Sequence, residues 1–311
     1  MKILVGDPRV WTPQPGGVAV SVGVFDGVHL GHRQMLQELF ADAAALGDIP
    51  IGAITFDRHP LATIAPERAP ELLTTPDERL ALFEEAGLDF AAVLTFDEAM
   101  RSLSPEGFVD TVLANGLGAR LVVVGDGFRF GLNARGDVDE LRRLGDHFGF
   151  AVRGVKLLET EAGPISSTLI RQALRAGDVA GVTALLGRRF ARTGRVVAGD
   201  HRGTEIGFPT ANLDIRAGLV VPARGVYAAV AVLEGARIPA VVNIGVRPTF
   251  DGVREVVEAH LLDFTADLYG RDLTLEFVDR LRPEERFGSV AELVEQIGED
   301  VEAARVRLRR L

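Results

Sequence analysis

The sequence predicts an α/β domain with a parallel sheet between helices, followed by a small β-barrel domain with a C-terminal helix. Three observations predict this arrangement. Strand and helix patterns alternate up to residue 186, which is typical of a parallel sheet covered on both faces. From about residue 190 the pattern changes to short β-rich runs broken by glycine and proline, which favours a barrel or sandwich. The length of 311 residues also suits two domains, which we expect at 1–186 and 187–311.

The first half gives its elements in order. Apolar runs predict strands at Val18–Val24, Ile51–Phe56, Ala91–Phe96, Leu121–Gly125 and 151–157. Helical patterns lie between them at 31–46, 76–86, from Pro105 onwards and near 136–147. Since the carboxyl ends of parallel strands meet at one edge of a sheet, ligands are expected to bind there.

The second half begins with two short helical patterns, 167–175 and 178–186, which join the two domains. Strands are then predicted at Thr193–Ala198, Gly225–Leu233, Ala240–Ile244, Val256–Leu262 and Leu273–Val278. A final helix begins near Ser289, where Ser289 and Glu292 match a capping box. An apolar stripe along this helix comprises Leu293, Ile297 and Val301.

Composition narrows the class of protein. No apolar run approaches the roughly 18 residues that a membrane span needs, and the first eight residues form no signal-peptide core, so a cytoplasmic protein is expected. Cysteine is absent from the sequence, which excludes disulfides and thiolate chemistry. The net charge is −10, with −9 up to Leu186 and −1 after it, so nucleic acid is not an expected partner. The sequence has two lysines, Lys2 and Lys156; neither follows a glycine, so no Walker A loop is present.

The segment 23–32, Gly-Val-Phe-Asp-Gly-Val-His-Leu-Gly-His, lies where a buried strand passes into a helix. Such a helix start binds anions, because free N–H groups and the helix dipole point at the ligand. His29 and His32 are three residues apart and share one helical face, where imidazoles can donate to a phosphate. A bare H-x-x-H pattern is more often a surface turn. The strand–turn–helix context favours a phosphate site, with Gly31 allowing a ligand to approach the backbone.

H-x-G-H in this context is the signature of the nucleotidylyltransferase superfamily, whose Rossmann-like sheet it implies. The longer string resembles the adenylyltransferase module of the bacterial bifunctional riboflavin kinase/FAD synthetase family. Three further segments resemble that family: 56–60, 125–131 and 165–171. The resemblance implies catalytic roles for His29 and His32. It implies nucleotide or phosphate binding by Phe25, Asp26, Gly27, Gly31, Asp57, Gly125, Ser166, Ser167, Thr168 and Arg171, and flavin binding by His59, Phe128 and Phe130. Taken singly, Asp57 and His59 are also consistent with turn formation, and phenylalanines such as these two are more often core residues than flavin contacts.

Two positions depart from the family pattern. Arg58 stands where the family usually has proline, which affects the turn that carries Asp57 and His59. Gly127 stands where the family usually has an acidic or amide side chain, so a polar contact to substrate or metal is missing. Both departures concern the efficiency of adenylyl transfer and leave the fold unaffected.

The segment 194–213 has glycines every four or five residues, which suits a loop that folds over phosphates. Thr210 and Asn212 are two residues apart, so an extended backbone turns both side chains the same way. A hydroxyl and an amide carbonyl are hard oxygen ligands that suit Mg²⁺. Any four-residue piece of the segment, taken alone, is better explained by ordinary turns and strand edges of a β-barrel.

The whole segment resembles the riboflavin kinase domain motif, centred on Pro-Thr-Ala-Asn at 209–212. Later segments that resemble the same domain are 225–227, 243–250, 257–264 and 267–270. The resemblance implies Mg²⁺ binding by Thr210 and Asn212, nucleotide binding by Gly199, Gly203, Gly207 and Pro209, and a catalytic base at Glu258. A carboxylate within reach of a primary alcohol can accept its proton during attack on phosphorus. On pattern alone, Glu258 is a solvent-facing residue of an alternating strand.

Together the two resemblances imply a bifunctional enzyme of flavin cofactor biosynthesis. It would use ATP and a divalent cation, Mg²⁺, to phosphorylate riboflavin to FMN, and then adenylylate FMN to FAD. The alternative is a riboflavin kinase whose adenylyltransferase domain is weakened or inactive. A flavin- or nucleotide-sensing protein without turnover and a nucleic-acid-binding barrel are the other classes considered. The expected partners are small molecules, with no membrane partner, and the oligomeric state is not predicted.

Overall fold

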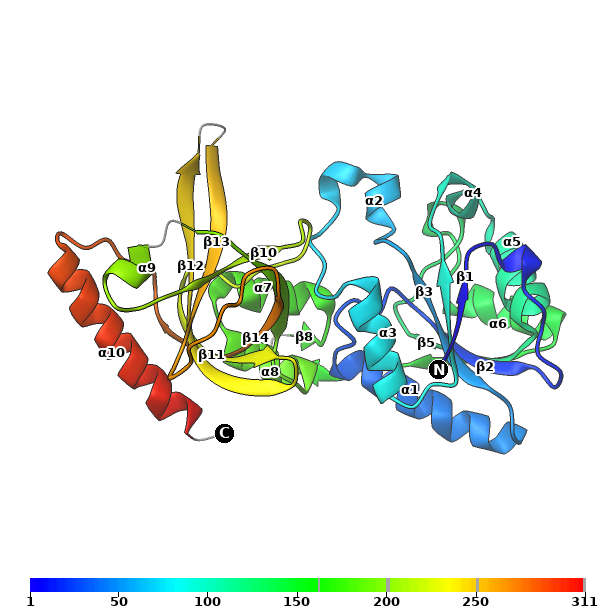
Figure 1. Ribbon diagram of the computed structural model, residues 1–311. Helices are drawn as coiled ribbons and strands as arrows, with labels where there is room; N and C mark the ends of the chain where they lie inside the picture. Colours follow the sequence, from blue (N-terminus) through cyan, green and yellow to red (C-terminus); the bar gives the residue numbers. More distant parts are fainter. Residues whose placement is uncertain (162, 200–201, 250–251, 310–311) are drawn as a thin grey trace. The chain divides into compact units, whose positions relative to one another are not determined.

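The computed structural model describes residues 1–161, 163–199, 202–249 and 252–309. The chain divides into two compact units, Met1–Ser167 and Thr168–Leu311 (Figure 1). Within the described ranges, no helix has both the length and the apolar character needed to cross a bilayer. Helix α7 (Ser167–Ala176) begins at the last residue of the first unit and continues into the second. Helix α8 (Val179–Leu186) lies within the second unit. The boundary between the two activities, at 186/187, stays a prediction.

The first unit contains a six-stranded parallel sheet in the order β1-β4-β3-β2-β5-β6. The predicted parallel α/β domain is therefore confirmed. Strand β1, at one edge, was not predicted: it is short, and Ile3 and Val5 are exposed, so it lacks the buried apolar run that marks the inner strands. The strands are β1 (Lys2–Val5), β2 (Val18–Val22), β3 (Ile51–Phe56), β4 (Phe90–Leu94), β5 (Ala119–Gly125) and β6 (Ala151–Val155).

Helices cover both faces of the sheet (Figure 1). Alternate residues of each inner strand point to opposite sides and pack against these helices. Val18, Val20 and Val22 of β2 pack toward α5, a π-helical segment and α6. Ala19 packs on the other side, toward α1 and α3. The helices are α1 (Leu30–Ala43), α2 (Leu61–Ile64), α3 (Pro76–Glu85), α4 (Glu98–Arg101), α5 (Pro105–Phe108) and α6 (Val138–Phe148), with the π-helical segment at Val109–Leu117.

The strand order determines where a ligand would meet the sheet. Strand β2 lies between β3 and β5, so the turns after these three strands lie next to one another at the carboxyl edge. The chain runs from β2 outward through β3 and β4, and then returns to the other side of β2 with β5. This change of direction is the place where open α/β sheets bind ligands. The short hairpin β7 (Glu159–Thr160) and β8 (Gly163–Pro164) follows the sheet.

The second unit is a closed barrel of six antiparallel strands in the order β10-β13-β12-β11-β14-β9, which confirms the predicted barrel. The glycine-rich segment also includes one short helix, α9 (Arg202–Glu205), which was not predicted. The strands are β9 (Ala191–Val197), β10 (Ala211–Ile215), β11 (Gly225–Leu233), β12 (Ala236–Thr249), β13 (Gly252–Leu261) and β14 (Asp272–Arg282).

Helix α10 (Val290–Leu308) packs against β11, β12 and β14, and its first residue follows the predicted cap. The Ser289 hydroxyl accepts the Glu292 N–H at 3.2 Å. The reciprocal bond of a capping box is not formed in the described structure, because the Glu292 carboxylate accepts the Gly288 N–H at 2.9 Å instead. The prediction of a full capping box is therefore wrong, although the helix start is correct.

Candidate functional site

The turn that follows β2 has an unusual backbone that residues 73 and 74 hold in place. Phe25, Gly27 and Val28 have positive φ angles of 54°, 83° and 38°. Positive φ is costly for a β-branched residue, so such a turn persists only when its surroundings fix it. The Asp26 carboxylate accepts the N–H groups of Leu73 at 2.9 Å and Thr74 at 3.0 Å. Asp26 is thus buried as the anchor of the turn, which positions the two histidines.

The two predicted histidines lie against each other at the start of α1. His29 is the N-cap, and its Nδ1 accepts the His32 N–H at 3.3 Å. The rings stack with centroids 3.6 Å apart and 17° between their planes, and Phe25 packs against His32. An Nδ1 that accepts a hydrogen bond leaves the proton of a neutral ring on Nε2. His29, which is 2% exposed, is therefore held in one tautomer and one orientation.

His32 is kept neutral by its surroundings. Burial lowers its pKa well below the usual value for histidine, and the nearby His29 and Arg79 lower it further. Its Nδ1 is buried and has no hydrogen-bond partner among the described residues. At neutral pH this ring therefore acts as a hydrogen-bonding group without charge.

Arg79 of α3 is a buried cation that the sequence analysis missed. Its Nη1 donates to the Thr55 hydroxyl at 2.7 Å and to the Phe56 carbonyl at 2.9 Å. The Thr55 hydroxyl in turn donates to the Val24 carbonyl at 3.0 Å, so Arg79 and Thr55 tie the ends of β2 and β3 together. Burial lowers the pKa of Arg79. The available signal was an arginine among apolar residues on the inner face of helix 76–85.

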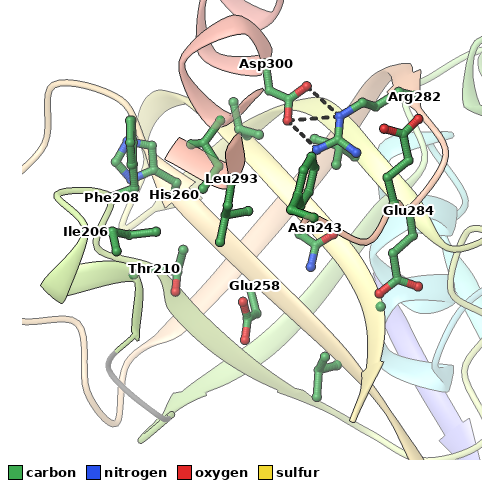
Figure 2. A pocket seen from close by; sticks show the side chains of 18 of the residues that line it. Ile206, Phe208, Thr210, Asn243, Glu258, His260, Arg282, Glu284, Leu293 and Asp300 are labelled. Carbon is green, nitrogen blue, oxygen red and sulfur yellow. Dashed lines mark hydrogen bonds and ion pairs between the residues drawn. The ribbon is translucent and has the colours of Figure 1, made fainter. Parts of the chain in front are cut away.

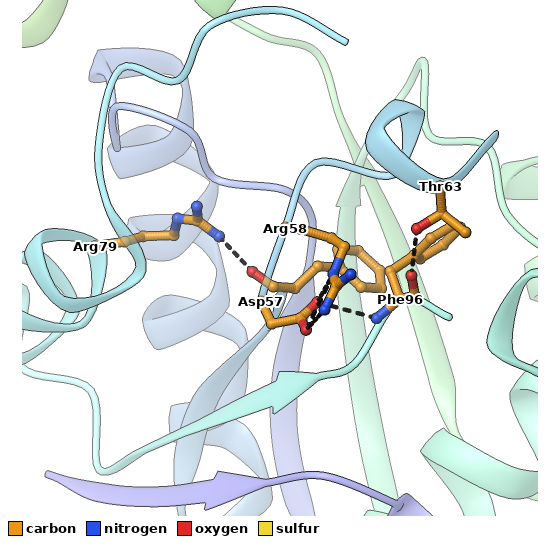
Figure 3. Close-up of polar contacts among 6 residues, drawn as sticks. Asp57, Arg58, Thr63, Arg79 and Phe96 are labelled. Carbon is orange, nitrogen blue, oxygen red and sulfur yellow. Dashed lines mark hydrogen bonds and ion pairs between the residues drawn. The ribbon is translucent and has the colours of Figure 1, made fainter. Parts of the chain in front are cut away.

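Asp57, at the end of β3, is occupied by protein contacts. Its carboxylate accepts the Phe96 N–H at 3.1 Å and pairs with the Arg58 guanidinium at 2.9 Å (Figure 3). His59 Nδ1 accepts the Leu61 N–H at 3.2 Å at the start of α2. The departure at Arg58 therefore adds an ion pair to the turn. The assignments of Asp57 to nucleotide and of His59 to flavin stay predictions.

The loop after β5 presents one buried and one partly buried aromatic ring. Phe128 and Phe130 stack at 5.4 Å, and Phe130 belongs to the core of the sheet. Gly125 ends β5, and its carbonyl accepts the Phe128 N–H at 2.9 Å. Gly127 is exposed, and a β-carbon added there would have no neighbour within 4 Å. A longer side chain at 127 therefore has room.

The predicted serine-rich segment meets the turn at two points. The Ser167 hydroxyl donates to the Asp26 carbonyl at 2.8 Å. A β-carbon on Gly31 would lie 3.2 Å from both the Ile165 carbonyl oxygen and the His29 Nδ1. Protein atoms therefore already crowd a side chain at 31, and the approach of a ligand to Gly31 stays a prediction. Ser166 precedes this contact, whereas Thr168 and Arg171 lie on α7 in the second unit, so their place at the nucleotide stays a prediction.

The barrel contains a cavity of about 330 Å³ between its strands and α10 (Figure 2). The predicted metal-binding and catalytic residues of this domain all line it. The residues that form its wall come from the segment 203–212, from β11, β12, β13 and β14, from the loop before α10 and from α10 itself. They include Thr210, Asn212, Asn243, Glu258, His260, Glu284, Leu293 and Ile297.

Strand register brings the predicted residues together. Glu258 of β13 lies directly opposite Asn212 on one side and Asn243 on the other. Directly opposed residues of an antiparallel pair point to the same face, so the three side chains form a row across β10, β13 and β12. The row puts a predicted metal ligand beside the predicted base. Asn243 was quoted in the motif but given no role, and its place opposite Glu258 is visible only from the register.

The glycine-rich segment is shaped by close contacts. A β-carbon on Gly199 would lie 2.2 Å from the Asn212 side-chain nitrogen. One on Gly203 would lie 2.4 Å from the Phe208 carbonyl oxygen and 3.3 Å from the Thr210 hydroxyl. Gly207 has a φ of 89°, and Pro209 follows it directly before Thr210. The first two glycines thus allow the backbone to pass over the residues that would hold a cation, and their nucleotide contacts stay predictions.

An ion pair closes the side of the cavity next to α10. Arg282 of β14 donates to the Asp300 carboxylate at 2.8 Å, and both side chains are largely buried (Figure 2). The Arg282 guanidinium also lies over the Phe287 ring at 5.5 Å. Breaking a buried pair of this kind costs several kcal/mol, about 3–5. The pair fixes α10 against the barrel and was not predicted, because its partners are eighteen residues apart on different elements.

Two family models match the chain in the predicted order. The model described as FAD synthetase matches residues 12–169, and the one described as riboflavin kinase matches residues 186–308. Among the relatives, a bifunctional riboflavin kinase/FMN adenylyltransferase of Escherichia coli K12 is 38% identical over 98% of this chain and 97% of its own. One of Pseudomonas fluorescens with the same name is 40% identical over 94% of each chain.

A solved structure described as a macrolide-efflux protein from Streptococcus pneumoniae has the same fold. Its TM-score is 0.88 at 30% identity, and the match covers 98% of this chain and 99% of the other. Both domain models and the nearly full-length bifunctional relatives support the two-activity interpretation, not the alternative of a kinase with a weakened partner domain. The chain belongs to the bifunctional riboflavin kinase/FMN adenylyltransferase family.

Proposed function

We propose that the chain converts riboflavin to FAD in two steps that each consume one ATP. The barrel transfers the γ-phosphoryl group of ATP to the terminal ribityl hydroxyl, which gives FMN and ADP. The parallel-sheet domain then transfers AMP from a second ATP to FMN, which gives FAD and pyrophosphate. The observation that carries the proposal is the opposed pair Asn212 and Glu258 at the wall of the barrel cavity. We assign the steps to residues 187–311 and 1–186, which the matched models at 186–308 and 12–169 support.

In the kinase step, Glu258 acts as the base. Its carboxylate accepts the proton of the ribityl hydroxyl while that oxygen bonds to the γ-phosphorus and the bond to ADP breaks. General-base catalysis of this kind typically contributes about 10²–10⁴ in rate. The position of Glu258 in the row with Asn212 and Asn243 supports the role, because phosphoryl transfer depends mainly on positioning and charge neutralisation.

A magnesium ion fits the donors that this site offers. Thr210 supplies a hydroxyl and Asn212 an amide oxygen, both hard neutral ligands. Mg²⁺ usually keeps several waters and takes further ligands from nucleotide phosphates, so two protein oxygens are sufficient. Among the described residues no cluster of three histidine or carboxylate side chains suits a metal on its own, which agrees with a cation that binds together with ATP. When bound, it would neutralise charge on the β- and γ-phosphates.

In the adenylyl step, the attacking group is a phosphate oxygen of FMN. It bonds to the α-phosphorus of ATP as the bond to pyrophosphate breaks, so no covalent enzyme intermediate is required. His29 donates from Nε2 to the phosphates, which its accepting Nδ1 supports. His32, neutral because of its lowered pKa, stabilises the leaving pyrophosphate as a hydrogen-bond donor without a charge of its own.

The remaining assignments follow the family resemblance. Ser166, Ser167, Thr168 and Arg171 would hold the outer phosphates. The bond from the Ser167 hydroxyl to the Asp26 carbonyl supports a position of this segment beside the turn. Phe25, Asp26, Gly27, Gly31, Asp57 and Gly125 would surround the nucleotide, and His59, Phe128 and Phe130 the flavin. Gly199, Gly203, Gly207 and Pro209 would contact ATP in the barrel. The partners would be riboflavin, FMN and ATP, and the use of ATP in both steps supports a cytoplasmic location.

One time course tests the proposal. The full chain is incubated with riboflavin, ATP and Mg²⁺, and riboflavin, FMN and FAD are separated by chromatography. FMN should rise first and FAD should follow at its expense. FMN that accumulates without FAD, even when FMN and ATP are supplied directly, would contradict the second step. No conversion by a folded protein would contradict both steps and favour a sensing role.

A further inference from the structure

His260 lies two residues beyond the predicted base and holds the segment that carries the predicted metal ligands. Alternate residues of a strand share a face, so His260 points to the same side of β13 as Glu258. The register pairs Ala211 with Ala259, which puts His260 level with Thr210 just outside the start of β10. Its ring lines the cavity (Figure 2). Its Nδ1 lies 2.8 Å from the Pro209 carbonyl oxygen.

The direction of this hydrogen bond follows from its partner. A carbonyl oxygen only accepts, so Nδ1 must carry the proton. A neutral His260 is then the Nδ1–H tautomer, the opposite of the tautomer at His29. Pro209 has no N–H of its own, and the ladder of β10 begins after Thr210. The His260 bond therefore orients the peptide between Pro209 and Thr210 at the point where regular pairing has not yet begun.

In the described part of the chain, other contacts hold the residues on either side of this peptide, and His260 holds its carbonyl. Upstream, the Phe208 N–H donates to the Gly203 carbonyl at 2.8 Å, and the Phe208 ring meets the His260 ring edge to face at 5.5 Å. Downstream, Ala211 and Asn212 pair with β13. Without the His260 bond, a rotation of the Pro209–Thr210 peptide would move the Thr210 hydroxyl oxygen relative to the Asn212 amide oxygen. These two oxygens must meet the same cation.

We propose that His260 is a positioning residue of the kinase reaction, which fixes the Thr210 hydroxyl for the cation and nucleotide through its Nδ1–H bond to Pro209. This inference rests on the proposed function of the barrel. Groups that orient metal ligands typically contribute about 10–100-fold to metal affinity or activity. The competing explanation is that His260 packs against Phe208 and has no effect on the cation.

A pair of variants separates the two explanations. His260→Asn keeps an N–H donor at nearly the position of Nδ1, whereas His260→Leu keeps apolar bulk against Phe208 and removes the donor. In the full chain, His260→Leu should raise the Mg²⁺ concentration for half-maximal FMN formation and lower kcat/KM for ATP by about 10–100-fold. The KM for riboflavin should change little. His260→Asn should stay within about threefold of the native values, since the oriented donor remains.

Binding gives a readout apart from turnover. The affinity for ADP is measured by calorimetry with and without Mg²⁺. Because the adenylyltransferase domain is the same in the native and variant proteins, the difference in ADP affinity between them reports on the barrel. His260→Leu should lose the gain in ADP affinity that Mg²⁺ provides and keep the Mg²⁺-free affinity. In native protein labelled with ¹⁵N-histidine, where only six histidines must be assigned, the His260 signal should show the Nδ1–H tautomer.

Adenylylation of supplied FMN should be unchanged in both variants, which shows that the first unit is folded. The unchanged KM for riboflavin shows that the barrel of each variant is folded. Three outcomes would each overturn the inference. His260→Leu could keep the native Mg²⁺ dependence, or His260→Asn could lose as much kcat/KM for ATP as His260→Leu. The third outcome is an Nε2–H tautomer of His260 in the native protein. A native protein that makes no FMN would overturn the proposed function together with it. Native kinase activity that His260→Leu preserves would overturn the positioning role alone.

Discussion

The site after β2 and the site in the barrel are built in opposite ways. The first is local: ten residues, 23–32, form a strained turn and a capped helix, and His29 and His32 contact each other directly. The second is assembled from distant segments, because Asn212, Glu258 and Asn243 meet only through strand register. A local site should depend on the chemistry of single groups. A site that depends on register should also depend on the residues that hold its strands and loops in place.

Glu258→Gln should give the largest effect. The amide keeps the size of the side chain and its place in the row, but it cannot take a proton from the ribityl hydroxyl. FMN formation should fall by about 10²–10⁴-fold. The measurement is the initial rate of FMN formation from riboflavin and ATP at saturating Mg²⁺. Adenylylation of supplied FMN in the same sample is the control, and a kinase rate within a factor of about two of native would rule out the base role.

His29 tests whether the local site works through chemistry or through helix capping. His29→Ala removes both the imidazole and the cap, and FAD formation from FMN should fall by about 10²–10³-fold, the usual cost of losing one donor to a developing charge. His29→Asn is the matched control, because asparagine is a good N-cap and can accept the His32 N–H. It should regain the stability that His29→Ala loses, typically about 1 kcal/mol, without regaining activity. Recovery of adenylyl transfer in His29→Asn would reduce His29 to a cap.

The same contrast explains how far the sequence could be interpreted. Strand and helix positions followed from apolar periodicity, and Ile51–Phe56 and Gly225–Leu233 have the predicted bounds. The local site was visible as a motif, because its residues are neighbours in sequence. The contacts of Arg79 and the ion pair of Arg282 with Asp300 could not be predicted. Each joins residues on different elements, and the sequence does not say which elements lie next to each other. The row around Glu258 needed the register of three strands, which pattern alone does not specify.

Stability should respond to pH differently in the two units. The pKa of His32 is lowered in the folded state, whereas the unfolded chain takes up this proton near pH 6.5. Below about pH 6.5 the unfolded state therefore binds more protons, and the free energy of unfolding of the first unit falls as pH falls, by up to about 1.4 kcal/mol per pH unit. In the barrel, the Arg237 and Arg189 contacts lower the pKa of Glu276, so stability from that group is lost only below about pH 4.5.

Urea unfolding between about pH 7.5 and 5.5, followed by domain-specific proteolysis, measures this difference. The first unit should weaken across this range while the barrel stays nearly constant. His32→Gln should flatten the profile of the first unit, because it removes the titrating ring. A profile that is equally steep in His32→Gln would show that another group carries the dependence.

Gly127 should give the smallest effect, and it tests whether the local site is complete. A β-carbon at 127 meets no neighbour within 4 Å and the backbone there does not need glycine, so Gly127→Asn should fold normally. One added hydrogen bond contributes about 0.5–1.5 kcal/mol, which would raise adenylyl transfer by about two- to tenfold and leave FMN formation unchanged. Gly127→Ala stiffens the loop equally without supplying an amide, so it separates the new contact from reduced flexibility. A faster adenylyl transfer in Gly127→Asn alone would mean that the native site lacks one polar contact. No gain in either variant would mean that adenylyl transfer needs no contact beyond those of the stacked rings of Phe128 and Phe130 and of the histidine pair.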